Sequence, residues 1–254
     1  DRIFRSADGG LTWTDLGEVI DPGPFAVGFA FAVPAASIVV ASDGAGNLHR
    51  STDAGLTWTQ TFATPGPAPG FLGSAVPVFT DPQTGYFGFG PGFVLRTTDG
   101  GASWHQISSG SGTELRDLDR FANGDRIAVG QAGQVLTSAG TSAAWLLRAT
   151  LTPASLEAVQ VIGPQEAVAV DGTGRVYRST DGGASWTASA SAPPELAAVD
   201  LHFATGVDGW VIGQGFASAA LFHTVDAGAT WVPVTDFLGT YVAVDFAGPS
   251  GWAA

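Results

Sequence analysis

The chain has 254 residues, and its 23 acidic side chains outnumber its 10 basic ones, giving a net charge of −13. This charge repels phosphate backbones and anionic lipid surfaces, so the composition argues against nucleic acid as a partner. The chain has no cysteine, which excludes disulfides and thiol chemistry, and its 45% of hydrophobic residues can form a sizeable core.

The N-terminal part contains one stretch that could be mistaken for a membrane span. The uncharged run from Pro22 to Ser42 is as long as a membrane helix of about 20 residues, but Gly28 and Pro34 interrupt it and β-branched residues crowd its second half. We therefore predict two adjacent strands and no membrane insertion. Because the chain has no methionine, we expect Asp1 to follow a processed or omitted segment. The lack of cysteine suits either an extracytoplasmic protein or chance in a compositionally biased genome, and we predict an extracytoplasmic location.

One nine-residue motif, Arg-Ser-x-Asp-x-Gly-x-Thr-Trp, recurs along the chain. Its tryptophans are spaced 45, 46, 41, 41 and 45 residues apart. The six copies end at Trp13, Trp58, Trp104, Trp145, Trp186 and Trp231. Their aspartates are Asp8, Asp53, Asp99, Asp181 and Asp226. In the degraded copy, which ends at Trp145, Gly140 replaces the aspartate, and we expect a looser turn there.

The residue types in the motif are those of a hairpin turn between two strands. The aspartate can accept backbone N–H bonds within the turn, glycine tolerates positive φ, and the tryptophan packs beside the turn. Two further short alternating segments precede each motif, giving four strands per period of about 43 residues, which is the pattern of propeller blades.

These motifs resemble the Asp-box, or BNR, repeats of sialidases and related glycoside hydrolases. Together with a preceding Gly-Trp strand, as in GWVIGQGFASAALFHTVDAGATW, they are most similar to the family of the photosystem II assembly factor Ycf48. The resemblance covers the whole chain and implies a β-propeller with the motifs on peripheral turns, remote from the ligand-binding face. It does not imply an activity, because enzymes and binding scaffolds share the motif.

We predict an all-β fold, with residues 1–254 forming a single propeller of four-stranded antiparallel blades. The first motif lacks preceding strands, and the C-terminal strands YVAVDFAG and SGWAA lack a following motif. Joining them gives six blades, one of which is closed by both termini and leaves no exposed sheet edge. The alternative is part of a propeller with seven or more blades.

Two sets of charged residues invite a catalytic interpretation. The motif arginines Arg5, Arg50, Arg96 and Arg178 could be compared with the cluster that binds sialic acid, but they lie on different outer hairpins. We expect them to be solvated or paired across strands. A glycosidase needs two carboxylates about 5 to 9.5 Å apart on the face where the innermost strands begin. The candidates there are Asp117, Asp119, Asp200 and Asp245.

No metal or cofactor is expected. The four histidines show no metal-ligand spacing. The glycine-rich segments at Asp43 and Asp171 hint at calcium or phosphate loops, but they recur where a hairpin joins two strands, which favours plain turns.

We expect function to reside on loops entering the innermost strands, at residues 17–25, 62–71 and 108–114. The favoured hypothesis is a non-catalytic binding or assembly scaffold for a protein or carbohydrate partner. The proposed binding residues are Arg116, Arg120, Phe71 and Tyr241. The alternatives are a secreted glycoside hydrolase, sialidase-like or endoglucanase-like, and a structural module of a larger surface protein.

One charged cluster does not repeat. This cluster lies in the repeat that ends at Trp145, whose motif is degraded. Either a specialised surface or an internal salt-bridge network would explain the cluster. Its members are Arg116, Asp117, Asp119, Arg120 and Arg126.

Overall fold

The computed structural model describes most of the chain. The described residues are 3–5, 12–17, 29–43, 46–64, 77–89, 93–108, 113–140, 142, 144–189, 196–215, 219–234, 244–247 and 250–253. Asp8, Phe71 and Tyr241 lie outside these ranges. The chain divides into two compact units, Asp1–Ile107 and Ser108–Ala254.

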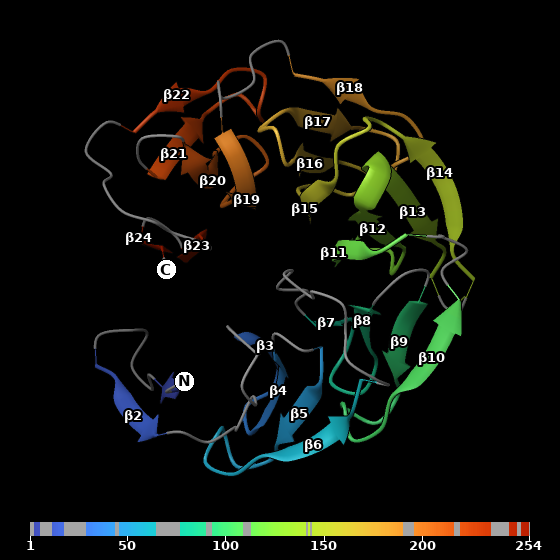
Figure 1. The fold of residues 1–254 in the computed structure, drawn as a ribbon, viewed down its shortest axis with the longest axis vertical. Coiled ribbons are helices and arrows are strands. Elements are labelled where there is room, and N and C mark those ends of the chain that lie inside the picture. The colour runs from blue at the N-terminus through green and yellow to red at the C-terminus, as the bar shows by residue number, and fades with distance from the viewer. Residues whose placement is uncertain are drawn as a thin grey trace. The chain divides into compact units, whose positions relative to one another are not determined.

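The first unit contains two four-stranded sheets and one two-stranded sheet, each with strands in chain order (Figure 1). The two-stranded sheet pairs β1 (Ile3–Arg5) with β2 (Thr14–Gly17). The next sheet comprises β3 (Phe29–Ala35), β4 (Ile38–Asp43), β5 (Leu48–Ser51) and β6 (Thr59–Phe62). The third comprises β7 (Val78–Phe79), β8 (Gly85–Phe89), β9 (Phe93–Thr97) and β10 (His105–Ser108).

The second unit repeats the four-stranded plan three times. The first sheet comprises β11 (Leu115–Arg120), β12 (Arg126–Gly130), β13 (Gln134–Ser138) and β14 (Leu146–Thr150), with a short 3-10 turn η1 (Gln131–Gly133). The second comprises β15 (Leu156–Val161), β16 (Ala167–Asp171), β17 (Val176–Ser179) and β18 (Thr187–Ala188). The third comprises β19 (Leu196–Phe203), β20 (Gly209–Gly215), β21 (Ala219–Thr224) and β22 (Val232–Pro233). A final two-stranded sheet pairs β23 (Val244–Ala247) with β24 (Ser250–Ala253).

The sheets confirm the predicted all-β fold and its four-stranded antiparallel plan. Each described motif joins the third strand of a sheet to the fourth, as the hairpin interpretation requires. The run from residue 29 to 43 forms β3 and β4. Among the described residues, no helix has the length and hydropathy needed to cross a membrane.

Apolar side chains pack between neighbouring sheets. In the second unit, Val168 and Val170 of β16 pack with Leu201 and Val211 of the following sheet. In the first unit, Val40 of one sheet packs with Phe87 of the next. The first strands β11, β15 and β19 lie side by side (Figure 1), so polar residues on one of these strands can reach the backbone of the next.

Candidate functional site

The carboxylates of Asp117 and Asp119 on β11 link two neighbouring sheets. Asp117 accepts the backbone N–H of Val159 at 2.8 Å, and Asp119 accepts that of Val161 at 2.7 Å, both across to β15. Each also accepts the N–H of the residue that follows it, at 2.8 and 2.7 Å. These oxygens hold the inner strands together, a structural role that the sequence pattern did not reveal.

Burial governs the ionisation of both carboxyls. It raises the pKa of Asp117 to about 8, although two backbone N–H donors favour the ionised form and the nearby charges of Asp200 and Asp119 oppose it. Burial also raises the pKa of Asp119 above its usual value. One strand further on, the Gln160 amide makes a similar link, accepting the N–H of Phe203 at 2.5 Å and donating to its carbonyl at 3.1 Å.

The two remaining candidate carboxylates lie on later inner strands. Asp200 on β19 accepts the N–H of Leu201 at 2.8 Å. The backbone of Asp245 pairs with that of Trp252 between β23 and β24, and its side chain lies outside the described atoms.

Arg116 lies near the N-terminal end of β11, between two glutamates. Its guanidinium is 3.9 Å from Glu114 and 3.8 Å from Glu157, and its side chain is 19% exposed. Its buried Nε has no hydrogen-bond partner among the described residues. Burial raises the pKa of Glu157, and the charge of Arg116 acts in the opposite direction. The buried Nε cannot be reached from solvent, so only the exposed part of this guanidinium is available to a ligand.

The structure separates the charged cluster of the sequence. Arg120 lies at the C-terminal end of β11, where it pairs with Arg126, about 13 Å along the strand from Arg116. Asp117 and Asp119 lie between the two ends and bind backbone. Arg116 and Arg120 thus belong to opposite ends of the sheet.

The Asp-box turns use their carboxylates internally. Ser51 donates to Asp53 at 2.7 Å and accepts the N–H of Gly55 at 2.8 Å. Asp53 accepts the N–H and the hydroxyl of Thr57 at 2.9 and 2.6 Å. The same bonds recur around Asp99, Asp181 and Asp226.

We expect these turns to lose stability in acid. The Thr57 hydroxyl and N–H lower the pKa of Asp53 to about 2; the pKa of Asp99 is also about 2, since the Ser103 bonds outweigh burial. Because the pKa of each aspartate is lower in the folded chain than in the unfolded chain, its ionised form stabilises the fold. This contribution is complete above about pH 4 and is lost as the pH falls towards 2. Melting temperatures measured from pH 5 to pH 2 should therefore fall, and should fall less steeply in Asp53→Asn. If the melting temperatures of the parent and the variant fell equally between pH 5 and pH 2, the lowered pKa of Asp53 would not contribute to stability.

The motif arginines have local structural partners. Arg50 donates from Nε to the carbonyl of Gly100 at 2.8 Å, which joins one sheet to the turn of the next. Arg96 lies 3.4 Å from the Tyr86 hydroxyl, and Arg178 forms an ion pair with Glu166 at 3.1 Å.

In the degraded motif, two side chains of the neighbouring hairpin hold the turn: Asp125 accepts the N–H of Gly140 at 2.6 Å, and Arg126 donates to the hydroxyl and carbonyls of the turn. Arg126 on β12 is 1% exposed, and its Nη2 donates to the Ser138 hydroxyl at 2.8 Å. The same nitrogen donates to the carbonyls of Ala139 and Ser142 at 3.3 and 2.6 Å. Its guanidinium carbon lies 5.8 Å from the ring centre of Trp145. The turn that we expected to be looser is therefore held from the neighbouring strand.

In two other sheets, the position equivalent to Arg126 is occupied by glycine. Arg126 pairs with Ser138, as Gly85 pairs with Thr97 and Gly209 with Thr224. A Cβ at Gly85 would lie 2.8 Å from the ring of Phe79, and one at Gly209 would lie 2.5 Å from that of Phe203. An arginine fits in the second unit's first sheet because Arg120, not an aromatic residue, lies opposite it.

The histidines and glycine-rich segments that are described form local contacts. Asp43 lies 3.0 Å from Nε2 of His49, and its carboxylate accepts the N–H of Asn47 at 2.9 Å. Asp171 accepts the N–H of Thr173 at 2.9 Å and the hydroxyl of Tyr177 at 3.0 Å. No group of three potential metal ligands occurs among the described residues.

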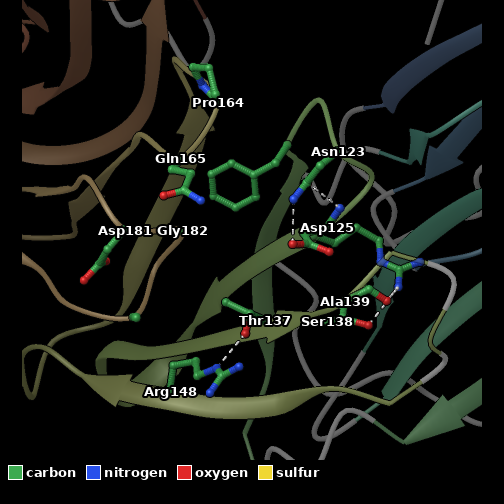
Figure 2. A pocket seen from close by; sticks show the side chains of 13 residues that line it. Asn123, Asp125, Thr137, Ser138, Ala139, Arg148, Pro164, Gln165, Asp181 and Gly182 are labelled. Atoms are coloured by element: carbon green, nitrogen blue, oxygen red, sulfur yellow. Dashed lines mark hydrogen bonds between the residues drawn. The ribbon is translucent and has the colours of Figure 1, made fainter.

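A cavity of about 250 Å³ lies between the sheets β11–β14 and β15–β18. Figure 2 shows Asn123 and Asp125 on one side, with Gln165, Asp181 and Gly182 on the other. Thr137 and Arg148 also line it, and Arg148 donates from Nε to the Thr137 hydroxyl at 2.9 Å. Sequence reasoning missed this cavity; the only signal was threonine at position 137, where four of the other five copies of the motif have arginine and one has His223.

Comparison with known proteins confirms the resemblance to Asp-box propellers of the Ycf48 kind. The family model of the photosynthesis system II assembly factor YCF48 matches residues 76–194, slightly under half of the chain. The photosystem II assembly lipoprotein Ycf48 of Synechococcus sp. (strain CC9902) is 31% identical over 117 residues, 44% of this chain and 35% of that protein. The match thus spans about a third of the relative's length.

Solved structures extend the likeness in fold to nearly the whole chain. A structure of YCF48 bound to D1 peptide matches with a TM-score of 0.74 and 20% identity, covering 99% of this chain and 81% of that one. Virginiamycin B lyase from Staphylococcus aureus matches with a TM-score of 0.79 and 13% identity, covering 100% of this chain and 84% of that one. Because an assembly factor and a lyase share the fold, the fold alone does not assign an activity.

Proposed function

We propose that the chain is a non-catalytic scaffold that binds a protein partner during assembly, as the Ycf48 relatives do. The observation that carries this proposal is the use of Asp117 and Asp119. Their carboxylates, the leading candidates for glycosidase chemistry, accept backbone N–H bonds that join neighbouring strands. A solved YCF48 binds a D1 peptide, so an extended protein segment is the first ligand to test. An extracytoplasmic location is in keeping with the curated lipoprotein relative.

We further propose that residues 1–254 form one six-bladed propeller. In this arrangement β23 and β24 supply the inner strands of the blade whose outer strands are β1 and β2. The five complete sheets and the two incomplete ones support this count. An experimental structure in which β24 and β1 are unpaired would contradict it.

Arg116 is the residue whose position best suits partner binding among the described candidates. It lies near the N-terminal end of β11, and its side chain is 19% exposed between Glu114 and Glu157. A carbonyl or carboxylate of a bound segment could accept a charge-assisted hydrogen bond from the exposed part of the guanidinium.

The proposal predicts that a fluorescent D1 peptide binds the chain and that Arg116→Ala weakens binding about tenfold. Arg120→Ala is the matched control, since it removes the same charge from the opposite end of the same strand. Fluorescence anisotropy would measure both variants. A larger loss in Arg120→Ala would move the binding surface to the other end of the sheet.

A panel of chromogenic glycosides tests the enzymatic alternative with the same protein. We expect no turnover. Turnover that disappears in Asp117→Asn, together with no peptide binding, would overturn the scaffold proposal.

A further inference from the structure

The cavity in Figure 2 occupies the place that a motif arginine fills elsewhere. In the first unit, Arg50 reaches from β5 to the next motif and donates to the Gly100 carbonyl at 2.8 Å. In the second unit's first sheet, the residue at the same motif position is Thr137, and the glycine equivalent to Gly100 is Gly182. Both line the cavity.

The surroundings of the two glycines differ accordingly. A Cβ placed on Gly100 would lie 3.7 Å from an Nη atom of Arg50, whereas one placed on Gly182 would have no atom within 4 Å. Arg148 reaches the Thr137 hydroxyl through Nε, and no bond from it to Gly182 occurs among the described residues. The space beside Gly182 is therefore open.

The lining offers acceptors for a cation on Asp125, Asp181 and Gln165, and it also carries two arginines, Arg126 and Arg148. The Ser185 hydroxyl and N–H lower the pKa of Asp181, which favours its ionised form. Gln165 lies on the same side of the cavity as Asp181 (Figure 2). The net charge of −13 attracts cationic partners. At about 250 Å³ the cavity is smaller than the roughly 300 Å³ at which small-molecule pockets begin, and this suits a single side chain.

We propose that this cavity binds the guanidinium of an arginine side chain contributed by a protein partner. The inserted group takes the position of the missing motif arginine and donates to the Gly182 carbonyl and to the acceptors around it. This inference rests on the proposed function, because it assumes that the partner is a protein. It further specifies that this protein presents an arginine side chain to the cavity.

The test is a titration of the intact chain with the peptide acetyl-Gly-Arg-Gly-amide, followed by amide NMR spectra. We expect saturable shifts at Thr137 and Gly182, and binding at least about tenfold weaker when citrulline replaces arginine. A glutamate peptide that binds instead would show that Arg148 recruits an anion, and would overturn the proposal. If no peptide shifts these amides, the proposal is wrong, whereas a D1 peptide that still binds elsewhere would leave the proposed function standing.

Two variants locate the binding site. Thr137→Arg should fill the cavity and weaken binding about tenfold or more, while Thr59→Arg on exposed β6 adds the same charge and should not. Arg148→Gln should tighten binding severalfold, because it removes an opposing charge from the lining. Weaker binding in Arg148→Gln would overturn the proposal even if Thr137→Arg failed to fold.

Discussion

Replacing Arg126 by alanine is expected to lower the free energy of unfolding by about 3–5 kcal/mol. The side chain is 1% exposed, and its Nη2 serves Ser138, Ala139 and Ser142 at 2.6 to 3.3 Å. Its loss would leave the buried Ser138 hydroxyl and the carbonyls of Ala139 and Ser142 without this donor, and would leave a void beside Trp145. Urea unfolding followed by tryptophan fluorescence would measure the change.

Two further variants separate the causes. Arg178→Ala removes an arginine whose side chain is 35% exposed and whose partner is Glu166, so its loss should cost about 1 kcal/mol or less. Arg126→Met keeps most of the volume but has no donors, so it should recover only part of the stability. If Arg126→Met were as stable as the parent, packing would account for the effect and the hydrogen bonds would not.

The repeat was readable from the sequence because each Asp-box is a local structure. The hydroxyl, carboxylate and glycine that close a turn lie within nine residues, as Ser51, Asp53 and Gly55 do, so their spacing alone predicts their bonds. The bonds that depend on a neighbouring strand were not readable. Arg126 and Asp125 lie 12 and 15 residues before the turn residues that they bind, Ser138 and Gly140. A decayed motif does not indicate which distant side chains hold its turn.

The candidate site shows the same division. The sequence placed Asp117 and Asp119 on an inner strand, but their partners are backbone N–H groups of residues 42 positions later. Backbone acceptance carries no sequence signature, because any residue except proline supplies an N–H. The cavity beside Thr137 could not be predicted for a related reason. The missing arginine leaves a space between its own sheet and the next one, and that neighbour is not evident from the sequence.

Asp117 should make stability fall as the pH rises from 5 to 7. Burial raises its folded pKa to about 8, against about 3.8 for an ordinary aspartate, so the folded chain holds a proton in this range that the unfolded chain has released. The contribution of Asp117 to the free energy of unfolding is then complete below about pH 4 and is lost as the pH rises towards 8. The slope for one proton is about 1.4 kcal/mol per pH unit.

Asp117→Asn isolates this contribution. The amide keeps one acceptor for the N–H groups of Val159 and Leu118 but does not titrate, so the variant should be less stable than the parent at pH 5. The difference should shrink by about 2–3 kcal/mol by pH 7, as measured by urea unfolding at both pH values. The other titratable groups are present in both proteins, so most of their contribution cancels in the comparison; Asp119 and Asp200 are the groups coupled to Asp117. A constant difference between the two proteins would mean that the two N–H donors keep the buried carboxylate ionised, and that the link between β11 and β15 is a charge-assisted one.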